Sequence, residues 1–209
     1  AIGVIVHQVG EDVAVVVVGP ALLPVRHVTV IHLMLMGLTQ PLVEGEDVEL
    51  TLHFQHSGDL VVTGIRARIC ALRLGIQTEL AGIKHLNRLE QVMARAEWSD
   101  SSIHEGILLD RDDYVVSAIS SNLFLVLGGR LLTPRLDRCG VRGVMRSAIL
   151  AAFRERCEQR RIMLDMLPEA DEVFVCNAVR GIFPVTRIDH WEYGIGAVTR
   201  EVQQWLDSQ

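Results

Sequence analysis

Residues 80–92 read LAGIKHLNRLEQV, and this stretch sets the expectation for the rest of the chain. An apolar turn leads into Lys84, after which Leu86, Leu89 and Val92 recur at helical spacing. A lysine held half-desolvated where a helix begins is a good Schiff-base former. Lys84 is the only lysine in the chain. The stretch therefore predicts a helix from about Lys84 onward and a lysine that can react with an aldehyde.

Further blocks of sequence follow this stretch. They read EGILLD at 105–110, YVVS at 114–117, SNLF at 121–124, LTP at 132–134, GVRGVMR at 140–146 and DEVFVCNA at 171–178. Together, these blocks resemble the fold-type IV pyridoxal-phosphate enzymes, and AGIKHLNRLEQV is similar to the aminodeoxychorismate lyases in particular. The resemblance covers about residues 68–209 and implies a mixed α/β (α+β) domain of the aminotransferase type.

The chemistry implied by this resemblance centres on Lys84. The cofactor would be pyridoxal 5'-phosphate, with Lys84 holding its aldehyde and later shuttling protons. Asn87 and Arg88 would lie near the ring hydroxyl of the cofactor, or else on the surface of the helix. The implied reaction eliminates pyruvate from 4-amino-4-deoxychorismate and yields 4-aminobenzoate for folate biosynthesis. The resemblance also implies a small-molecule substrate and a homodimer, while the widely spaced cysteines favour reduced thiols in a cytoplasmic protein.

A phosphate site is expected where residues 140–146 enter a predicted helix over 141–159. The unpaired N–H groups and the positive end of the dipole at a helix start attract phosphate. By resemblance, the residues that contact the cofactor phosphate or ring are Val141, Gly143, Val144, Met145, Asn177 and Ala178. An ordinary glycine-containing helix start is the alternative reading.

Ser117 departs from the family pattern, which usually has a glutamate that keeps the pyridine nitrogen protonated. A serine hydroxyl can hydrogen-bond to that nitrogen but stabilises a positive charge less well, so the ring should accept electrons less readily. Elimination to an aromatic product has a large driving force and tolerates this better than transamination. The serine therefore favours a lyase over an aminotransferase, and an inactive partial lyase is a further alternative.

The remaining pattern predicts the elements of the second part of the chain. Strands are expected at 106–109, 114–117, 123–127, 130–132, 173–176 and 183–186, with a closing helix at 198–206. The pair Gly128-Gly129 predicts a tight hairpin. The basic cluster Arg154, Arg156, Arg160 and Arg161 is expected on the solvated face of a helix, since Glu155 and Glu158 interrupt it.

Residues 1–66 are expected to form a separate β-rich domain, followed by the pyridoxal-phosphate domain over 67–209. Runs dense in β-branched residues occur at 13–18, 28–36, 48–54 and 60–65. The usual motifs of the smaller fold-type IV domain, which bears an arginine that grips the cofactor phosphate, are absent from these residues.

Residues 28–66 resemble part of the periplasmic copper chaperones of the PCuAC type. His32 and Met34 would lie on the same side of a strand, and imidazole with thioether suits cuprous copper. The family needs two further ligands upstream, and Gly10 stands where spacing would place one of them. Ordinary strand packing of Met34 is therefore preferred, and a copper-binding module remains the alternative function.

Composition excludes several classes of function. The chain has 209 residues, a formal net charge of −6 and no basic stripe interleaved with aromatics, which argues against nucleic acid. Its four cysteines never approach a CxxC spacing, so neither a zinc site nor a disulfide framework is indicated. The apolar runs are too short to cross a bilayer, and no signal peptide is recognisable, so we expect no membrane partner.

Overall fold

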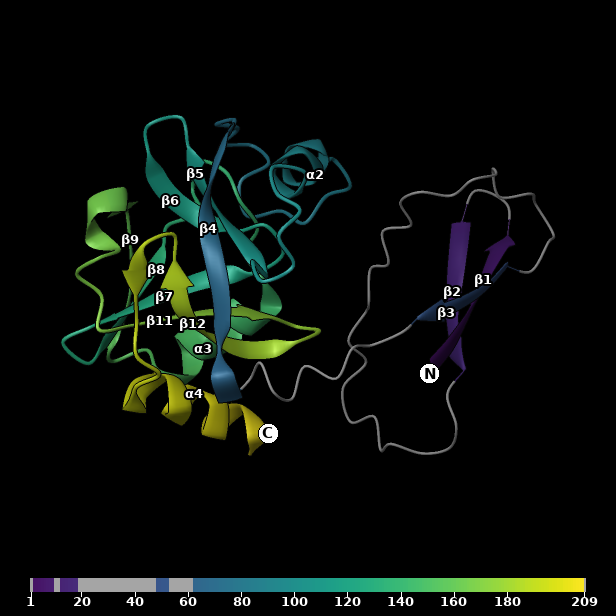
Figure 1. Ribbon diagram of the computed structural model, residues 1–209. Helices are drawn as coiled ribbons and strands as arrows, with labels where there is room; N and C mark the ends of the chain where they lie inside the picture. The colour runs from purple at the N-terminus through teal and green to yellow at the C-terminus, as the bar shows by residue number, and fades with distance from the viewer. Residues whose placement is uncertain (1, 10–11, 19–47, 53–61, 209) are drawn as a thin grey trace. The chain divides into compact units, whose positions relative to one another are not determined.

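The computed structural model describes residues 2–9, 12–18, 48–52 and 62–208, and its side chains from residue 62 onward (Figure 1). The chain forms two compact units, Ala1–His56 and Ser57–Gln209. Among the described residues, no helix is long and apolar enough to span a membrane. Each unit is a separate body with its own sheet.

The first unit contains a small antiparallel sheet with the strand order β2-β1-β3. Its strands are β1 (Ile2–Val9), β2 (Asp12–Val18) and β3 (Val48–Leu52). The expected strands at 13–18 and from 48 onward are therefore present, whereas β1 was not predicted. The expected strand at 28–36, with His32 and Met34, lies outside the described residues. Within the described ranges, no group of three or more His, Cys, Asp or Glu could hold a metal ion.

The second unit is a ten-stranded mixed sheet with the order β10-β6-β5-β4-β12-β11-β7-β8-β9, and β13 pairs with β12. Its strands are β4 (Ile65–Leu74), β5 (Glu105–Asp110), β6 (Tyr114–Ala118), β7 (Asn122–Leu127), β8 (Arg130–Pro134), β9 (Cys157–Arg160), β10 (Ile162–Met163), β11 (Glu172–Asn177), β12 (Gly181–Ile188) and β13 (Trp191–Glu192). Its helices are α2 (Leu89–Arg95), α3 (Val144–Ala152), the short 3-10 helix η1 (Leu164–Met166) and α4 (Ala197–Asp207).

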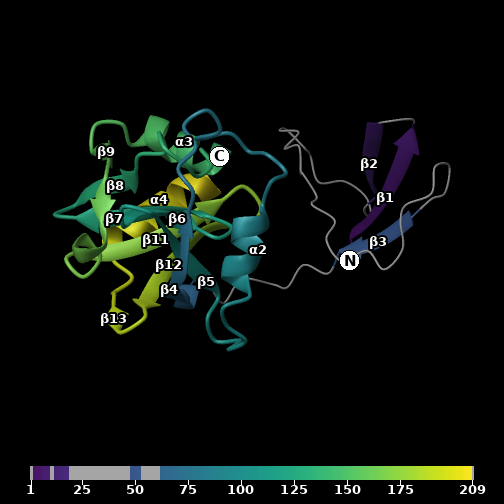
Figure 2. The same cartoon turned by 90° about the horizontal axis from the view of Figure 1, so that it is seen from above.

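The sheet curls until its two end strands meet. β9 and β10 stand at opposite ends of the strand order, yet Arg161 alone separates them in the sequence. The backbone therefore joins one edge of the sheet to the other, as in a barrel. Figure 2 labels β9, β8 and β7 one after another at one end of this strand order. Strands in such a sheet are buried on both faces and read as continuous apolar runs.

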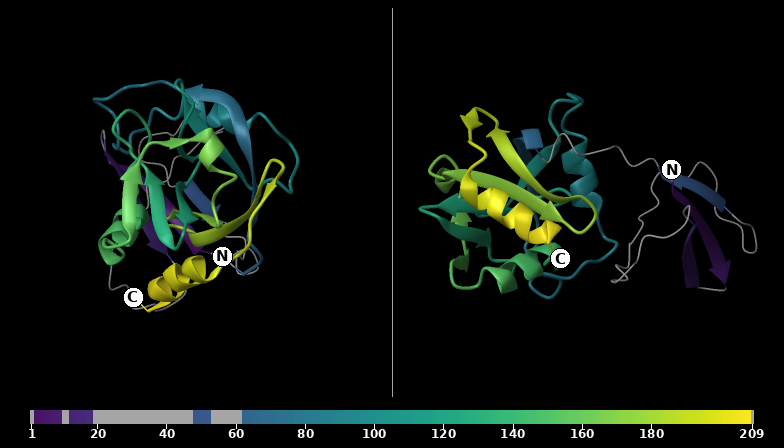
Figure 3. Two further views of the ribbon diagram at one scale, coloured as in Figure 1. Left: turned by 90° about the vertical axis from the view of Figure 1, so that its left-hand side faces the viewer. Right: turned by 90° about the horizontal axis from the view of Figure 1, so that it is seen from below.

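Alternate residues of each strand contribute to different cores. Ile107 and Leu109 point into the interior, while Leu108 between them packs on the outside. One outer cluster lies beneath α2 and includes Trp98 and Val116. The other outer cluster lies beneath α3 and α4, which cross the strands in Figure 3, and includes Phe124, Phe174, Ile149 and Val202. Strands β4, β5, β6, β7, β8, β11 and β12 therefore separate two packed layers.

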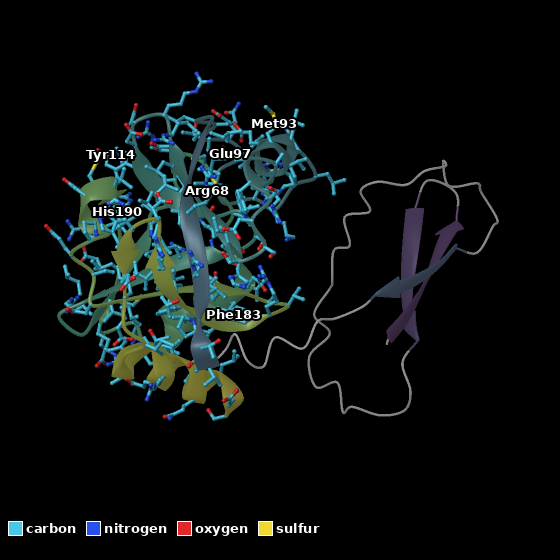
Figure 4. All side chains as sticks on the ribbon, in the orientation of Figure 1. Arg68, Met93, Glu97, Tyr114, Phe183 and His190 are labelled. Carbon is cyan, nitrogen blue, oxygen red and sulfur yellow. The ribbon has the colours of Figure 1, made fainter. Side chains whose placement is uncertain are left out.

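Helix α2 is fixed to the sheet where the pairing of β4 with β5 is interrupted. The register between these two parallel strands shifts between Ile69 and Arg73. Glu97, just after α2, accepts the freed backbone N–H groups of Ala71 at 2.7 Å and Leu72 at 2.8 Å. Figure 4 labels Glu97 near Arg68, with which it forms an ion pair at 3.7 Å. This irregularity in β4 therefore sets the position of α2.

Two helix predictions were wrong at their ends. Helix α2 begins at Leu89 rather than at Lys84, and α3 covers Val144–Ala152 rather than 141–159. Residues after Phe153 turn back instead, because the N–H of Leu131 donates to the carbonyl of Arg156 and β9 then pairs in parallel with β8. The arginine cluster consequently lies on a turn and on an edge strand, and it does not form a helix face.

The strand predictions from residue 106 onward are confirmed within one or two residues. Gly128 and Gly129 have φ of 55° and 76° and form the predicted tight turn between β7 and β8. The expected strand at 60–65 is wrong in its described part, since Val62 and Thr63 are helical and β4 begins only at Ile65. The rest of β4 was missed because arginines interrupt its apolar pattern.

Burial of the cysteine thiols makes stability depend on alkaline pH. Burial raises the pKa of Cys70, Cys139 and Cys176 from 9.0 to about 12, and that of Cys157 to about 11. Above pH 9.0 the unfolded thiols lose their protons while the folded ones keep them, so the unfolded state binds fewer protons. We expect the free energy of unfolding, measured with urea, to fall as pH rises from about 9 toward 12. A Cys176→Ala variant should show a shallower fall. A free energy of unfolding that rises over this range would contradict the raised thiol pKa values.

Candidate functional site

Lys84 lies in an extended segment between Gly82 and α2, and it is exposed. Its neighbour Leu86 is 77% exposed and Ile83 is exposed as well. The expectation of a half-buried amine is therefore wrong. Residues 83–88 have no helical structure, so Lys84 precedes α2 and does not begin it. The amine of Lys84 is open to a ligand from solvent.

Gly82 joins the Lys84 segment to the residues that lead into α3. Its N–H donates to the carbonyl of Gly140 at 2.8 Å, and its carbonyl accepts from the N–H of Arg142 at 3.0 Å. Gly82 has φ of 84°, and a Cβ there would lie 2.8 Å from Cδ of Arg142. A glycine is thus required for this close pairing. The pairing places Lys84 two residues away from the chain that begins α3.

Helix α3 begins without a side-chain cap. Gly143 is its N-cap, with φ of −67° and ψ of 151°, and Val144 at the first position is largely exposed. The start of α4 differs, because the Glu172 carboxylate accepts from the N–H groups of Val198 at 3.1 Å and Thr199 at 2.8 Å. The N–H groups of α3 are therefore available to an anion.

Asn122, which the sequence analysis did not single out, holds the residues just before α3. Its Nδ2 donates to the carbonyl of Val141 at 2.8 Å, and its Oδ1 accepts from the N–H of Gly143 at 3.1 Å. A Cβ on Gly143 would collide with this Oδ1. The block SNLF contained the signal, since a polar residue at the start of an apolar strand needs hydrogen-bond partners.

Asn177 belongs to the second segment that was predicted to contact phosphate. It connects this segment to residues 120 and 121, just before Asn122. Its Nδ2 donates to Oγ of Ser121 at 3.1 Å and to the carbonyl of Ser120 at 3.3 Å. Its Oδ1 accepts from the N–H groups of Val179 at 3.0 Å and Arg180 at 2.7 Å, which shapes the turn that contains Ala178. The two segments predicted to contact phosphate are thus both bonded to residues 120–122.

Buried Glu105 anchors this turn to the sheet. The Glu105 side chain is only 3% exposed and accepts from Nη2 of Arg180 at 2.9 Å and from Oγ of Ser121 at 3.1 Å. Ser120 also donates to this carboxylate and accepts from Arg180. The Arg180 guanidinium lies 5.7 Å from the ring centroid of Phe183, which Figure 4 labels. A buried carboxylate is stable only with such compensation.

Ser117 is presented to the outer face of the sheet by a bulge in β6. Ser117 pairs with Leu108 while Val115 pairs with Leu109, so Val116 is an extra residue in the strand. Bulges redirect side chains. Directly paired residues share a face, so Ser117 lies on the outer face with Leu108, where Val116 and Cys139 also pack. A Cβ at Gly140 would lie 2.7 Å from Val116, which places the chain before α3 over this bulge.

A cavity of about 270 Å³ lies between the Lys84 segment, α2 and residues 139–141. Its lining includes His85, Asn87, Arg88, Gln91, Gly140 and Val141. Burial lowers the pKa of Arg88, whose Nη2 donates to the carbonyl of Ile119 at 3.4 Å. Nδ1 of His85 and Oε1 of Gln91 are buried without a protein partner. The structure thus places the predicted residues Asn87, Arg88 and Val141 around one cavity, whereas Lys84 and Ser117 do not line it.

Comparison with known proteins identifies the family. The model of the Amino-transferase class IV family matches residues 47–188, and the chain belongs to this family. An aminodeoxychorismate lyase from Vibrio harveyi is 36% identical over 153 residues, which make up 69% of this chain and 56% of that protein. The crystal structure of 4-amino-4-deoxychorismate lyase from Pseudomonas aeruginosa has a TM-score of 0.71 at 44% identity and covers 73% of this chain and 57% of the other.

The chain is also similar to a more distant solved structure and matches a second family model. The branched-chain amino acid aminotransferase of Escherichia coli has a TM-score of 0.66 at 25% identity, covering 78% of this chain and 56% of that one. A model of LpqE-like lipoproteins matches residues 26–65. The mixed α/β fold of type IV expected for the second part of the chain is confirmed. The chain spans a little over half the length of the two lyases.

The close contact between Gly143 and Asn122 predicts the effect of one methyl group. Gly143→Ala should move the chain before α3 and lower the free energy of unfolding by about 1–3 kcal/mol, as overpacking does. Gly194→Ala is the matched control, because a Cβ there meets nothing within 4 Å. Urea unfolding of both variants checks this expectation. A Gly143→Ala variant as stable as Gly194→Ala would show that the contact is not restrictive.

Proposed function

We propose that this chain is the cofactor-binding part of a pyridoxal-phosphate-dependent 4-amino-4-deoxychorismate lyase, which produces 4-aminobenzoate and pyruvate in folate biosynthesis. One observation carries the proposal: the only lysine lies two residues from Gly82, whose backbone is bonded to the residues that open the uncapped helix α3. The segment that carries an amine for an aldehyde is therefore bonded to the segment that leads to N–H groups for a phosphate. The similarity to two lyases supports the same reading.

The described residues fit pyridoxal phosphate. The N–H groups after Gly143 suit its phosphate, and a side chain at Gly143 would fill the space used by Asn122. Lys84 is free in solvent to reach the aldehyde. Asn87 and Arg88 border the cavity beside Val141 and supply donors for a ring hydroxyl. The predicted residues thus offer a donor set for each end of the cofactor.

When bound, the cofactor withdraws electrons from the substrate amine and so makes elimination possible. Lys84 is the residue that can move a proton at its Nζ atom between substrate positions. The N–H groups of Val144 and Met145, together with the turn at Asn177 and Ala178, would hold the phosphate and so orient the cofactor, whereas the N–H of Gly143 is already bonded to Asn122. Binding at both ends restricts the reacting groups to one geometry.

Ser117 decides which reaction of the family is favoured. The Oγ atom can donate one hydrogen bond but carries no negative charge, so it stabilises a cationic ring less than a carboxylate would. An elimination that forms an aromatic ring depends less on that stabilisation than amino transfer does. We therefore favour the lyase over the aminotransferase reaction.

A second polypeptide is part of the proposal, in the form of a homodimer in the cytoplasm. Apolar side chains around Lys84 are exposed, and such patches mark interaction sites. They are Leu80, Ile83, Leu86, Leu89 and Met93, the last of which Figure 4 labels on α2. All four cysteines are free thiols, which suits a reducing compartment.

Lys84 can be tested by covalent labelling. The full chain is incubated with pyridoxal phosphate, reduced with borohydride and digested for mass spectrometry, and we expect one phosphopyridoxyl group on the peptide containing Lys84. Lys84→Arg keeps the charge but should show neither the label nor 4-aminobenzoate production. Labelled protein without lyase activity would reject the lyase assignment while retaining the cofactor site, and activity in Lys84→Arg would reject both.

Ser117 can be tested by restoring a carboxylate. Ser117→Glu should raise cofactor affinity or the elimination rate about tenfold, since a carboxylate beside a cation shifts its pKa by about 1–3 units. Ser117→Gln has the same size without the charge and should give no such gain. An absorbance titration with pyridoxal phosphate measures the affinity. Equal behaviour of the two variants would mean that residue 117 does not face the ring nitrogen.

A further inference from the structure

The side chain of Asn122 is bonded to two successive parts of the chain before α3. Its Nδ2 donates to the carbonyl of Val141 at 2.8 Å, and its Oδ1 accepts from the N–H of Gly143 at 3.1 Å. The two bonds span Arg142 and define the direction in which the chain enters α3. Because Gly143 is the N-cap of that helix, its orientation sets the directions of the N–H groups that follow.

Asn122 itself belongs to a rigid part of the fold. It is the first residue of β7, it pairs with Cys176 of β11, and it is 7% exposed. Strand β7 is paired on both sides, with β8 and β11. The hydrogen bonds of Asn122 therefore attach the chain before α3 to the centre of the sheet and not to another loop.

The same chain is held from its opposite side by the Lys84 segment. Gly82 bonds to Gly140 and Arg142, the residues that alternate with the two that Asn122 contacts. The stretch from Gly140 to Gly143 is thus fixed between a buried strand and the segment that carries the lysine. Without Asn122, this stretch would be held only by the hydrogen bonds of Gly82, on its exposed side.

We propose that Asn122 is a positioning residue that sets the affinity of this protein for the phosphate group of its cofactor, without touching the cofactor. The inference rests on the proposed function for the identity of the ligand. An unrestrained chain before α3 must be ordered when phosphate binds, and this loss of conformational freedom weakens binding. With Asn122 in place, the chain is already ordered in the folded protein. The N–H groups of Val144 and Met145 can then bind the anion without further ordering.

Glu172 provides a matched control. Like Asn122, it is a buried polar residue on a strand that bonds to the backbone at the start of a helix, but its helix is α4 rather than α3. Glu172→Ala and Asn122→Ala therefore remove equivalent restraints, and only the second restraint belongs to the candidate phosphate site. Asn122→Ser is a further variant, which removes the carboxamide that bonds to Val141 and Gly143 and adds no charge.

The test compares binding of pyridoxal phosphate with binding of pyridoxal, which lacks the phosphate. We expect Asn122→Ala to weaken binding of pyridoxal phosphate at least about tenfold, which corresponds to about 1.4 kcal/mol, and to change pyridoxal binding less than about twofold. Glu172→Ala should lower the melting temperature and leave both affinities unchanged. An equal loss for both ligands, or no loss, in Asn122→Ala would overturn the proposal. Asn122→Ser answers the same question if the alanine variant does not fold, because it adds no charge near the phosphate.

A second measurement separates this inference from the lyase assignment. Inorganic phosphate is titrated into Lys84→Arg protein while the amide NMR signals of Gly143, Val144 and Met145 are followed. Shifts that disappear on adding Asn122→Ala support the positioning role even if no lyase activity exists. The absence of any shift in the protein with Asn122 intact would overturn it, whatever the outcome of the labelling of Lys84.

Discussion

The candidate site depends on the backbone hydrogen bonds that Gly82 makes with Gly140 and Arg142. They join two segments almost sixty residues apart in the sequence, one with the only lysine and one with the open start of α3. A side chain at Gly82 would meet Arg142, and its φ of 84° suits glycine best. The segment with the lysine and the uncapped start of α3 are thus joined by the main chain itself, and the side chain of Asn122 adds two further hydrogen bonds.

The sheet explains how polar groups can be held so firmly beside this pairing. Strands β5, β6, β7 and β11 are buried on both faces, so their ends cannot shift without disturbing two packed layers. Ser117, Asn122 and Asn177 all stand at or near strand ends. The bulge in β6 turns Ser117 outward, toward the face on which the chain before α3 lies. Precise placement of a few polar residues is a product of apolar packing elsewhere.

The sequence predicted the strands after residue 105 well, because continuous apolar runs between turn residues are typical of strands buried on both faces. Periodicity failed at Lys84, where Leu86 and Leu89 have helical spacing but remain exposed. It also failed after Phe153, where pairing of β9 with β8 outweighed local helical preference. The roles of Asn122 and Glu105 could not be predicted, since their partners at Val141, Gly143 and Arg180 come from segments that only the folded sheet brings together.

The meeting of β9 and β10 at Arg161 has a consequence for solubility. An open sheet of this length would offer unsatisfied amide and carbonyl groups along two borders, and such borders recruit strands from other molecules into aggregates. Here the described domain closes one border onto the other with a short, arginine-rich link. The two edge strands are thus continuous with each other, which leaves less open border for strands of other molecules than two separate edges would.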